Sequence, residues 1–206
     1  MIEDILSKIV WLGHDGFRID ASKTVYIDPY QIPDGPGADL ILITHEHFDH
    51  CSPEDVAKIQ QSGSVIITEK DSAAQLSGDV RIVQVGESIT IDNVTVEAVP
   101  AYNTNKDFHP KSKGWLGFIL EVDGVRVYHA GDTDFIPEMK DFATDIALLP
   151  VSGTYVMTAD EAVEAALAIN PKIAIPMHYG AIVGGGQDAE SFKKALEGKV
   201  DVRILD

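Results

Sequence analysis

Three histidines and an aspartate fall within six residues of this sequence, in the segment Thr44-His45-Glu46-His47-Phe48-Asp49-His50. The segment directly follows an apolar run, Leu40-Ile41-Leu42-Ile43, which predicts a buried strand over residues 39–44. Neutral imidazole and carboxylate are ligands that Zn, Fe, Mn and Ni accept in proteins. Core packing gives no reason for so many titratable groups at a strand end. The pattern His-x-His-x-Asp-His therefore predicts a site for two metal ions.

Three other predicted strands also end in polar residues. Asp132 follows the strand predicted over residues 125–129, and His178 follows the strand over 172–177. The segment Ser152-Gly153-Thr154-Tyr155 follows the strand over 145–151. Functional side chains in α/β sheets lie beyond the carboxyl ends of the strands. We therefore expect these segments to share one cleft with residues 45–50. A turn role for Asp132 and a packing role for His178 are the alternatives.

The elements that must hold these groups alternate between strand and helix signals. Helix starts are marked by the N-cap Ser52 with Pro53 behind it, and by a capping box from Thr158 to Glu161. Shorter helices are predicted over 69–76 and 188–196. Strands are predicted over 9–13, 17–20, 24–28, 39–44, 64–68, 80–85, 88–91, 94–100, 115–122, 125–129, 145–151, 172–177 and 200–205. This order favours an α/β sandwich of two sheets covered by outer helices.

The charge balance restricts the partners. The chain has 206 residues and a formal net charge of −17. Two bound dications would still leave the surface field negative, which repels long polyanions. We expect no nucleic-acid partner, whereas a small substrate held at the metals is compatible with this charge. The sequence does not indicate an oligomeric state.

The cysteine count and the hydropathy pattern indicate the compartment. The single cysteine, Cys51, cannot form an intramolecular disulfide and favours a reducing compartment. No apolar run is long enough to span a bilayer, and residues 1–8 lack the pattern of a signal peptide. We expect a cytoplasmic protein that does not associate with membranes.

Several motifs together resemble a known family. They are Ile27-Asp28-Pro29, the His-x-His-x-Asp-His segment, His129-Ala130-Gly131-Asp132-Thr133-Asp134 and Pro176-Met177-His178-Tyr179-Gly180. The chain resembles the metallo-β-lactamase superfamily of binuclear metal hydrolases, in the small branch that includes L-ascorbate-6-phosphate lactonase and related hydrolases. The resemblance implies a single domain over residues 1–206. Its implied fold is a four-layer αββα sandwich with two mixed β-sheets and helices on the outer faces.

The resemblance also implies a ligand set. Asp132 would bridge two divalent ions, of which one would be held by His45, His47 and His109, and the other by Asp49, His50 and His178. A hydroxide between the ions would be the nucleophile, and Asp49 would also relay a proton. Asp28 and Thr44 would orient the ligands, with supporting roles for His14 and His129. His109 is nominated only by its place in the loop over residues 100–114, so His14 and His129 are its competitors.

The same loop is where we expect substrate specificity. Lys106, Lys111 and Lys113 give it positive charge, which suits a small anionic substrate, although exposed lysines can equally serve solvation. The candidate substrate contacts are Tyr102, Asn103, Asn105, Lys111, Thr154 and Tyr155.

The predicted function is that of a metal-dependent hydrolase acting on an ester, lactone or phosphodiester bond. Zinc is the favoured ion, and manganese, iron and nickel suit the same nitrogen and oxygen donors. A di-iron redox protein, a nuclease and a non-catalytic binding protein are the alternatives. The redox alternative is disfavoured because the redox branch of the family has a carboxylate where this chain has His47. The nuclease alternative is disfavoured because a nuclease would usually have a basic surface, whereas this chain is strongly acidic.

Overall fold

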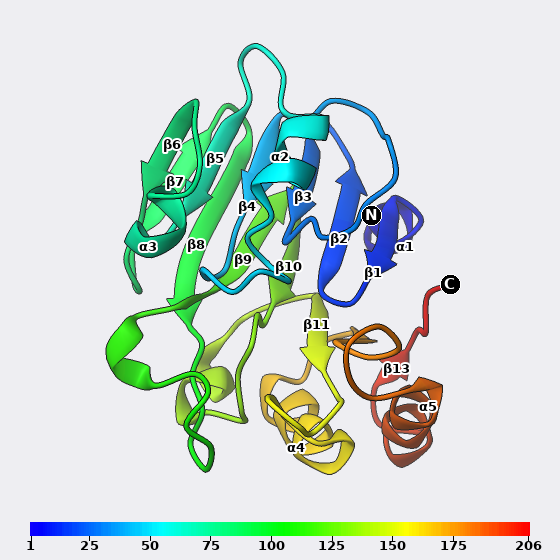
Figure 1. The fold of residues 1–206 in the computed structure, drawn as a ribbon. Helices are drawn as coiled ribbons and strands as arrows, with labels where there is room; N and C mark the ends of the chain where they lie inside the picture. The colour runs from blue at the N-terminus through cyan, green and yellow to red at the C-terminus, as the bar shows by residue number, and fades with distance from the viewer.

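Two β-sheets lie face to face in the computed structural model, which describes residues 1–206 (Figure 1). The first sheet has the spatial order β1 (Ile9–Gly13), β2 (Gly16–Asp20), β3 (Thr24–Ile27), β4 (Leu40–Leu42), β5 (Val65–Thr68) and β6 (Asp79–Ile82). The second has the order β13 (Asp201–Val202), β12 (Ile173–Met177), β11 (Ile146–Pro150), β10 (Val125–His129), β9 (Leu116–Val122), β8 (Val94–Pro100) and β7 (Ser88–Ile91).

Each sheet combines parallel and antiparallel pairs. In the first sheet β1 to β3 are antiparallel and β3 to β6 are parallel. In the second, β7 to β10 are antiparallel and β10 to β13 are parallel. Strands inside a parallel region are covered on both faces and are apolar throughout. Every residue of β4, β11 and β12 is accordingly buried, and the prediction of two mixed sheets is confirmed.

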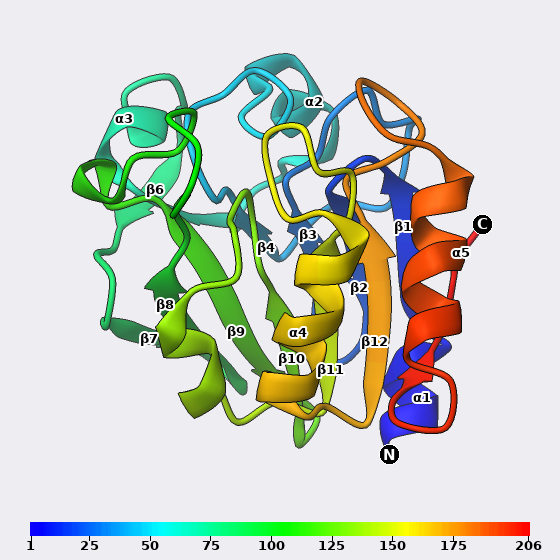
Figure 2. The ribbon, with the colours of Figure 1, turned by 90° about the horizontal axis from the view of Figure 1, so that it is seen from below.

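Helices cover the outer faces of both sheets. α4 (Ala159–Ile169) and α5 (Gly186–Ala195) lie over the second sheet, and α2 (Pro53–Ile59) covers the first (Figures 1 and 2). The remaining helices are α1 (Ile2–Leu6), α3 (Lys70–Ala73) and two 3₁₀ helices, Lys111–Lys113 and Pro137–Asp141. Ser52 caps α2, and the predicted capping box of Thr158 and Glu161 begins α4. The four-layer αββα sandwich is thus confirmed.

The hydrophobic core matches these layers. One cluster of 48 buried residues joins the two sheets to α4 and α5, and a second cluster of nine lies between the first sheet and α2. None of the helices combines the length and apolar character needed to cross a membrane.

The predicted elements differ from the structure mainly at their ends. The strand predicted over 200–205 is reduced to β13, because only Asp201 and Val202 pair with β12. α5 begins at Gly186, two residues before its predicted start, since the Asp188 carboxylate accepts the N–H of Gly185 and caps the first turn. α1 has no side-chain cap and was not predicted.

The loops that follow the central strands gather at one edge of the sandwich. The loops after β4, β11 and β12 lie at the same edge, which is opposite the edge that carries α1 (Figure 2). All predicted metal ligands lie in these loops or close to them.

Candidate metal centre

Three residues of the centre adopt the left-handed backbone conformation that side chains rarely take. His14, Asp28 and His178 have φ angles of 51°, 44° and 60°. Each follows a strand of the sandwich by one residue, so the chain turns sharply there. Non-glycine residues in this region cost energy and occur disproportionately at functional sites, although Asp and His tolerate it better than most. The backbone is thus bent to bring these side chains inward.

The first ligand group consists of His45, His47, His109 and Asp132. Their ligand atoms all lie within 4.8 Å of one another. His45 Nε2 lies 3.0 Å from His47 Nδ1, and His109 Nε2 lies 3.1 Å from Asp132 Oδ2. Two imidazole ligands of a tetrahedral zinc ion stand about 3.3 Å apart, given Zn–N bonds of about 2.0 Å. The four side chains therefore have the spacing of a metal site.

The second ligand group consists of His14, Asp49, His50 and His178, again within 4.8 Å of one another. His14 Nε2 lies 3.1 Å from Asp49 Oδ2. Asp132 reaches this group too, because its Oδ1 is 3.3 Å from the Nε2 atoms of both His50 and His178. One oxygen of Asp132 thus faces each group.

Several buried polar atoms that face the space between the two ligand groups have no hydrogen-bond partner. The Nε2 atoms of His50, His109 and His178 and Oδ1 of Asp132 are buried without a hydrogen-bond partner. Leaving a buried polar group unsatisfied costs about 1–3 kcal/mol each. Divalent cations between the two groups would satisfy all of these atoms, so the residues present fit the predicted ions.

The carboxylate of Asp28 orients ligands from beneath the centre. It accepts hydrogen bonds from the Thr44 backbone N–H at 2.8 Å and the Thr44 hydroxyl at 2.6 Å. It also lies 2.8 Å from Nδ1 of His50, and Thr44 Oγ1 lies 3.0 Å from Nδ1 of His45. These contacts hold both rings with Nε2 toward the centre, which is the arrangement expected for Asp28 and Thr44.

Two further ligands have orienting partners. Asn103 Oδ1 lies 3.1 Å from Nδ1 of His109 and accepts the His109 backbone N–H at 2.8 Å. Asn103, expected to contact substrate, therefore lies behind a ligand. Ser152 Oγ lies 2.9 Å from Nδ1 of His178. The segment that begins with Ser152 was expected in the cleft, but no role was predicted for Ser152 itself.

The three histidines that competed for one ligand position lie in different places. His109 belongs to the first group, and His14 belongs to the second. His129 belongs to neither, since its Nε2 lies 2.9 Å from the Asp15 carbonyl oxygen and its Nδ1 accepts the Gly131 N–H. His129 thereby links β10 of the second sheet to the turn between β1 and β2 of the first.

Known proteins are similar to this chain in sequence and fold. Residues 8–178 match the family described as the β-lactamase superfamily domain. A metallo hydrolase from Ignicoccus hospitalis is 25% identical with a TM-score of 0.80, over 96% of this chain and 94% of its own. A crystallised protein from Parabacteroides distasonis, assigned as a metal-dependent hydrolase, is 38% identical with a TM-score of 0.84, over 96% and 93%. A UPF0173 metal-dependent hydrolase from Thermococcus kodakarensis is 35% identical over 96% of both chains.

The chain belongs to the UPF0173 family of the metallo-β-lactamase superfamily. The narrower likeness to L-ascorbate-6-phosphate lactonase stays a prediction.

Electrostatics distinguishes the two ligand groups of this UPF0173 chain. Burial, together with the charge of His50, holds the pKa of His45 well below its usual range, so its ring is neutral and ready to bind metal. Burial also disfavours the charged form of His178, but the carboxylates of Asp132 and Asp15 outweigh it and raise that pKa to about 9. In the absence of metal, the second group therefore holds protons beside Asp132.

The lysines of the loop over 100–114 are all paired with carboxylates. Lys106 lies 2.7 Å from Asp134, and Lys113 lies 2.6 Å from Glu46. Lys111 pairs with Glu138 at 2.9 Å. These ion pairs partly balance the charge of all three ammonium groups, and the side chains of Lys111 and Lys113 are 64% and 40% exposed.

The other predicted substrate contacts bind protein groups or are exposed. The Tyr102 hydroxyl donates to Glu138 at 2.9 Å, and the Asn105 amide donates to Glu161 at 3.0 Å. Thr154 is exposed, and the Tyr155 ring packs edge-on against Phe108 at 4.8 Å. The substrate contacts expected of these residues stay predictions.

Three large apolar side chains near ligands in the chain are exposed. Phe48, between two ligands in the chain, is 67% exposed. Phe108 precedes His109 and is 51% exposed, and Ile182 in the loop after β12 is 40% exposed. Phe48 packs edge-on against Tyr30 at 5.8 Å, as Phe108 does against Tyr155 at 4.8 Å.

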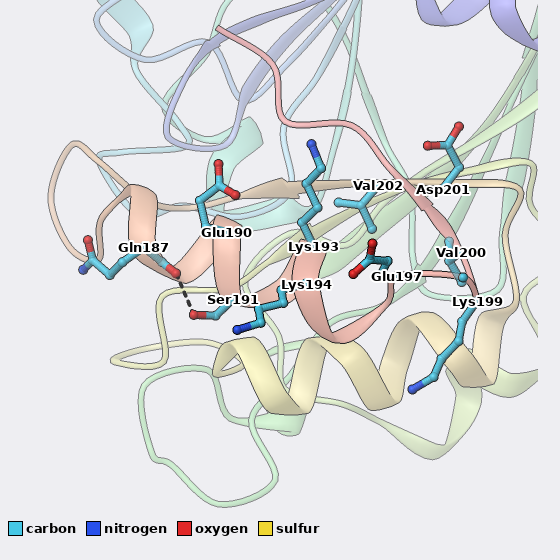
Figure 3. Close-up of a pocket in the computed structure, with 11 residues that line it drawn as sticks. Gln187, Glu190, Ser191, Lys193, Lys194, Glu197, Lys199, Val200, Asp201 and Val202 are labelled. Carbon is cyan, nitrogen blue, oxygen red and sulfur yellow. Dashed lines mark hydrogen bonds between the residues drawn. The ribbon is translucent and has the colours of Figure 1, made fainter.

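A separate hollow of about 920 Å³ lies between α5 and β13 (Figure 3). It is lined by both lysines and acidic residues, and it contains no ligand of either group. The charged residues that line it are Glu190, Lys193, Lys194, Glu197, Lys199 and Asp201. It is not part of the metal centre.

Proposed function

We propose that this chain is a hydrolase with a binuclear metal centre that cleaves an ester, lactone or phosphodiester bond in a small substrate. The observation that carries the proposal is the position of Asp132, whose Oδ2 faces His109 while its Oδ1 faces His50 and His178. A carboxylate that turns one oxygen toward each of two ligand groups is suited to bridging two cations.

The ligands divide between the two ions. His45, His47 and His109 would hold one ion, and Asp49, His50 and His178 the other, with Asp132 shared. Bound divalent ions polarise the scissile bond and lower the pKa of a water molecule from 15.7 towards about 7. Asp49 is the carboxylate of the centre that reaches solvent, with 14% of its side chain exposed, and His14 hydrogen-bonds it at 3.1 Å. Asp49 is thus placed to pass a proton to bulk water.

A small anionic substrate fits the charge of the centre rather than that of the lysine loop. Two bound dications would supply positive charge that draws an anion to the centre, whereas Lys106, Lys111 and Lys113 are each paired with a carboxylate. The exposed rings of Phe48 and Phe108 would contact an apolar portion of the same molecule.

The test is a screen of reconstituted protein. Metal-free protein loaded with zinc, manganese, iron or nickel is assayed on phosphodiesters, lactones, including a phosphorylated sugar lactone, and lactams. We expect turnover that disappears on chelation and in Asp132→Asn, which keeps the side-chain volume but removes the bridging charge. Turnover that survives both changes would contradict the proposal. Oxygen consumption by iron-loaded protein without hydrolysis would favour the redox alternative.

A further inference from the structure

Asp15 is a buried acid that the seven predicted ligands leave out. It lies in the turn between β1 and β2, with no solvent exposure. Six carboxylates are buried in this structure, and Asp15 is the only one whose two oxygens both lack a hydrogen-bond partner. The other five are Asp28, Asp55, Glu69, Asp132 and Asp134. A buried carboxylate without hydrogen bonds or a countercharge is strongly disfavoured, so its environment requires an explanation.

The side chain of Asp15 is directed at the second half of the centre. An oxygen of Asp15 lies within 4.8 Å of the ligand atoms of His50, Asp132 and His178. Oδ2 of Asp15 is 3.8 Å from Nδ1 of His50, but that nitrogen already has a partner in Asp28 at 2.8 Å. No lysine or arginine pairs with Asp15. Two buried carboxylates, Asp15 and Asp132, therefore lie close together with only the imidazoles of the centre beside them.

The backbone holds Asp15 in this position. Its carbonyl oxygen lies 2.9 Å from Nε2 of His129, which anchors the turn to the second sheet. The preceding residue, His14, has the left-handed φ of 51°, and a side chain at Gly16 would meet the Asp28 carbonyl oxygen at 3.2 Å. The turn is therefore tight and anchored, and the Asp15 carboxylate cannot swing out to solvent without breaking it.

We propose that Asp15 is an additional ligand of the second metal ion, beside His50, His178, Asp49 and Asp132. This inference rests on the two-ion centre of the proposed function. With Asp15 as a ligand, the two metal positions offer different donor sets. The first offers three imidazoles and one carboxylate oxygen, a set that suits tetrahedral zinc. The second offers the imidazoles of His50 and His178 and three carboxylates, while His14 is engaged by Asp49 at 3.1 Å, and this oxygen-rich set favours a six-coordinate ion such as Mn²⁺ or Fe²⁺.

The test compares metal binding by the wild type and two variants. Metal-free wild type, Asp15→Asn and the control Asp55→Asn are dialysed against Mn²⁺ or Zn²⁺, and bound metal is determined by elemental analysis over a range of free concentrations. Asp55 is a second buried acid, which pairs with Lys58 at 2.7 Å outside the centre. Wild type and Asp55→Asn are expected to bind two Mn²⁺ ions. Asp15→Asn should bind one of them about 10- to 100-fold more weakly, while its zinc affinity at the first position is unchanged.

The outcomes separate this proposal from the function on which it rests. Full Mn²⁺ affinity at both positions in Asp15→Asn overturns the ligand role of Asp15 and leaves the two-ion centre intact. Failure of the wild type to bind two ions of any kind overturns both.

A second measurement needs no variant, in case Asp15→Asn does not fold. Co²⁺ absorbs weakly in six-coordinate sites and strongly in tetrahedral ones, so it reports the geometry of each position in the wild type. One strong and one weak contribution are expected as Co²⁺ is added. Two strong contributions would contradict an oxygen-rich second position.

Discussion

At the scale of single residues, the centre depends on how the ligands are held as much as on the ligands themselves. Asp28 is the clearest case, because its two oxygens contact Thr44 and His50 at 2.6–2.8 Å while the side chain has no solvent exposure. It fixes the imidazole of His50 with Nε2 toward Asp132. A ligand ring that is held in this way loses little freedom when metal binds.

Replacement of Asp28 by asparagine tests whether Asp28 orients the His50 imidazole. In Asp28→Asn, the amide oxygen can still accept the Thr44 N–H, but the NH₂ group then faces the Thr44 hydroxyl and His50 Nδ1. Metal affinity should fall by about 10- to 100-fold, as measured by competition with a chromophoric chelator. The control is Asp145→Asn, since Asp145 accepts the Arg126 N–H at 3.1 Å far from any ligand. Equal affinities in the two variants would show that Asp28 does not orient the ligand.

A single residue, His178, is expected to control how metal affinity depends on pH. In the metal-free protein, the carboxylates near His178 overcome burial and raise its pKa to about 9. Its imidazolium must therefore lose a proton before it can bind metal at pH 7. Affinity at the second position should rise by about tenfold per pH unit between pH 7 and 9 for each proton released, and level off above pH 9. Calorimetry in buffers of different ionisation enthalpy counts these protons. Binding without proton release at pH 7 would be inconsistent with a charged His178.

At the scale of elements, strand ends and tight turns bring distant side chains together. Gly131 connects β10 to Asp132 with a left-handed φ of 62°. A Cβ atom there would meet the Leu116 carbonyl oxygen at 2.7 Å and Cβ of Thr44 at 3.2 Å. Glycine at this position lets β10 pass close to β9 and to the loop after β4.

Gly131→Ala is therefore expected to displace Asp132. The left-handed conformation alone costs about 1 kcal/mol for alanine, and the contact with the Leu116 backbone adds to it. Gly86→Ala is the matched control, because Gly86 has a φ of 89° with nothing within 4 Å of an added Cβ. Chemical denaturation should show a larger loss of unfolding free energy for Gly131→Ala, and only this variant should lose bound metal. Similar losses with intact metal content would show that the close approach at Gly131 is unimportant.

Sequence patterns predicted the elements better than the partners of individual side chains. His45, His47, Asp49 and His50 were recognisable because they are neighbours in the chain as well as in space. Asp15 was not singled out from the sequence, because the groups close to it in the centre come from distant positions such as Asp132 and His178. The lysines of the loop over 100–114 looked free for the same reason. Their acidic partners, such as Glu138 and Glu46, lie in segments that only the tertiary fold brings close.

At the scale of the whole molecule, the centre lies where the two sheets meet. Asp49 and His50 belong to the loop after β4 of the first sheet, whereas Asp132 and His178 follow β10 and β12 of the second. Ions bound between them would connect the two sheets at this edge in addition to the shared hydrophobic core.

Removal of metal should therefore lower the stability of the whole fold. A ligand that binds only the folded state at 100 times its Kd adds about 2.7 kcal/mol to the unfolding free energy. For a chain of 206 residues this corresponds to a shift in Tm of about 5–10 °C. Calorimetric scans of wild type with metal or with excess chelator measure the shift. Asp132→Asn is the control, because without the bridging carboxylate its Tm should depend much less on metal. A wild-type Tm that chelator leaves unchanged would mean that no ion joins the two sheets.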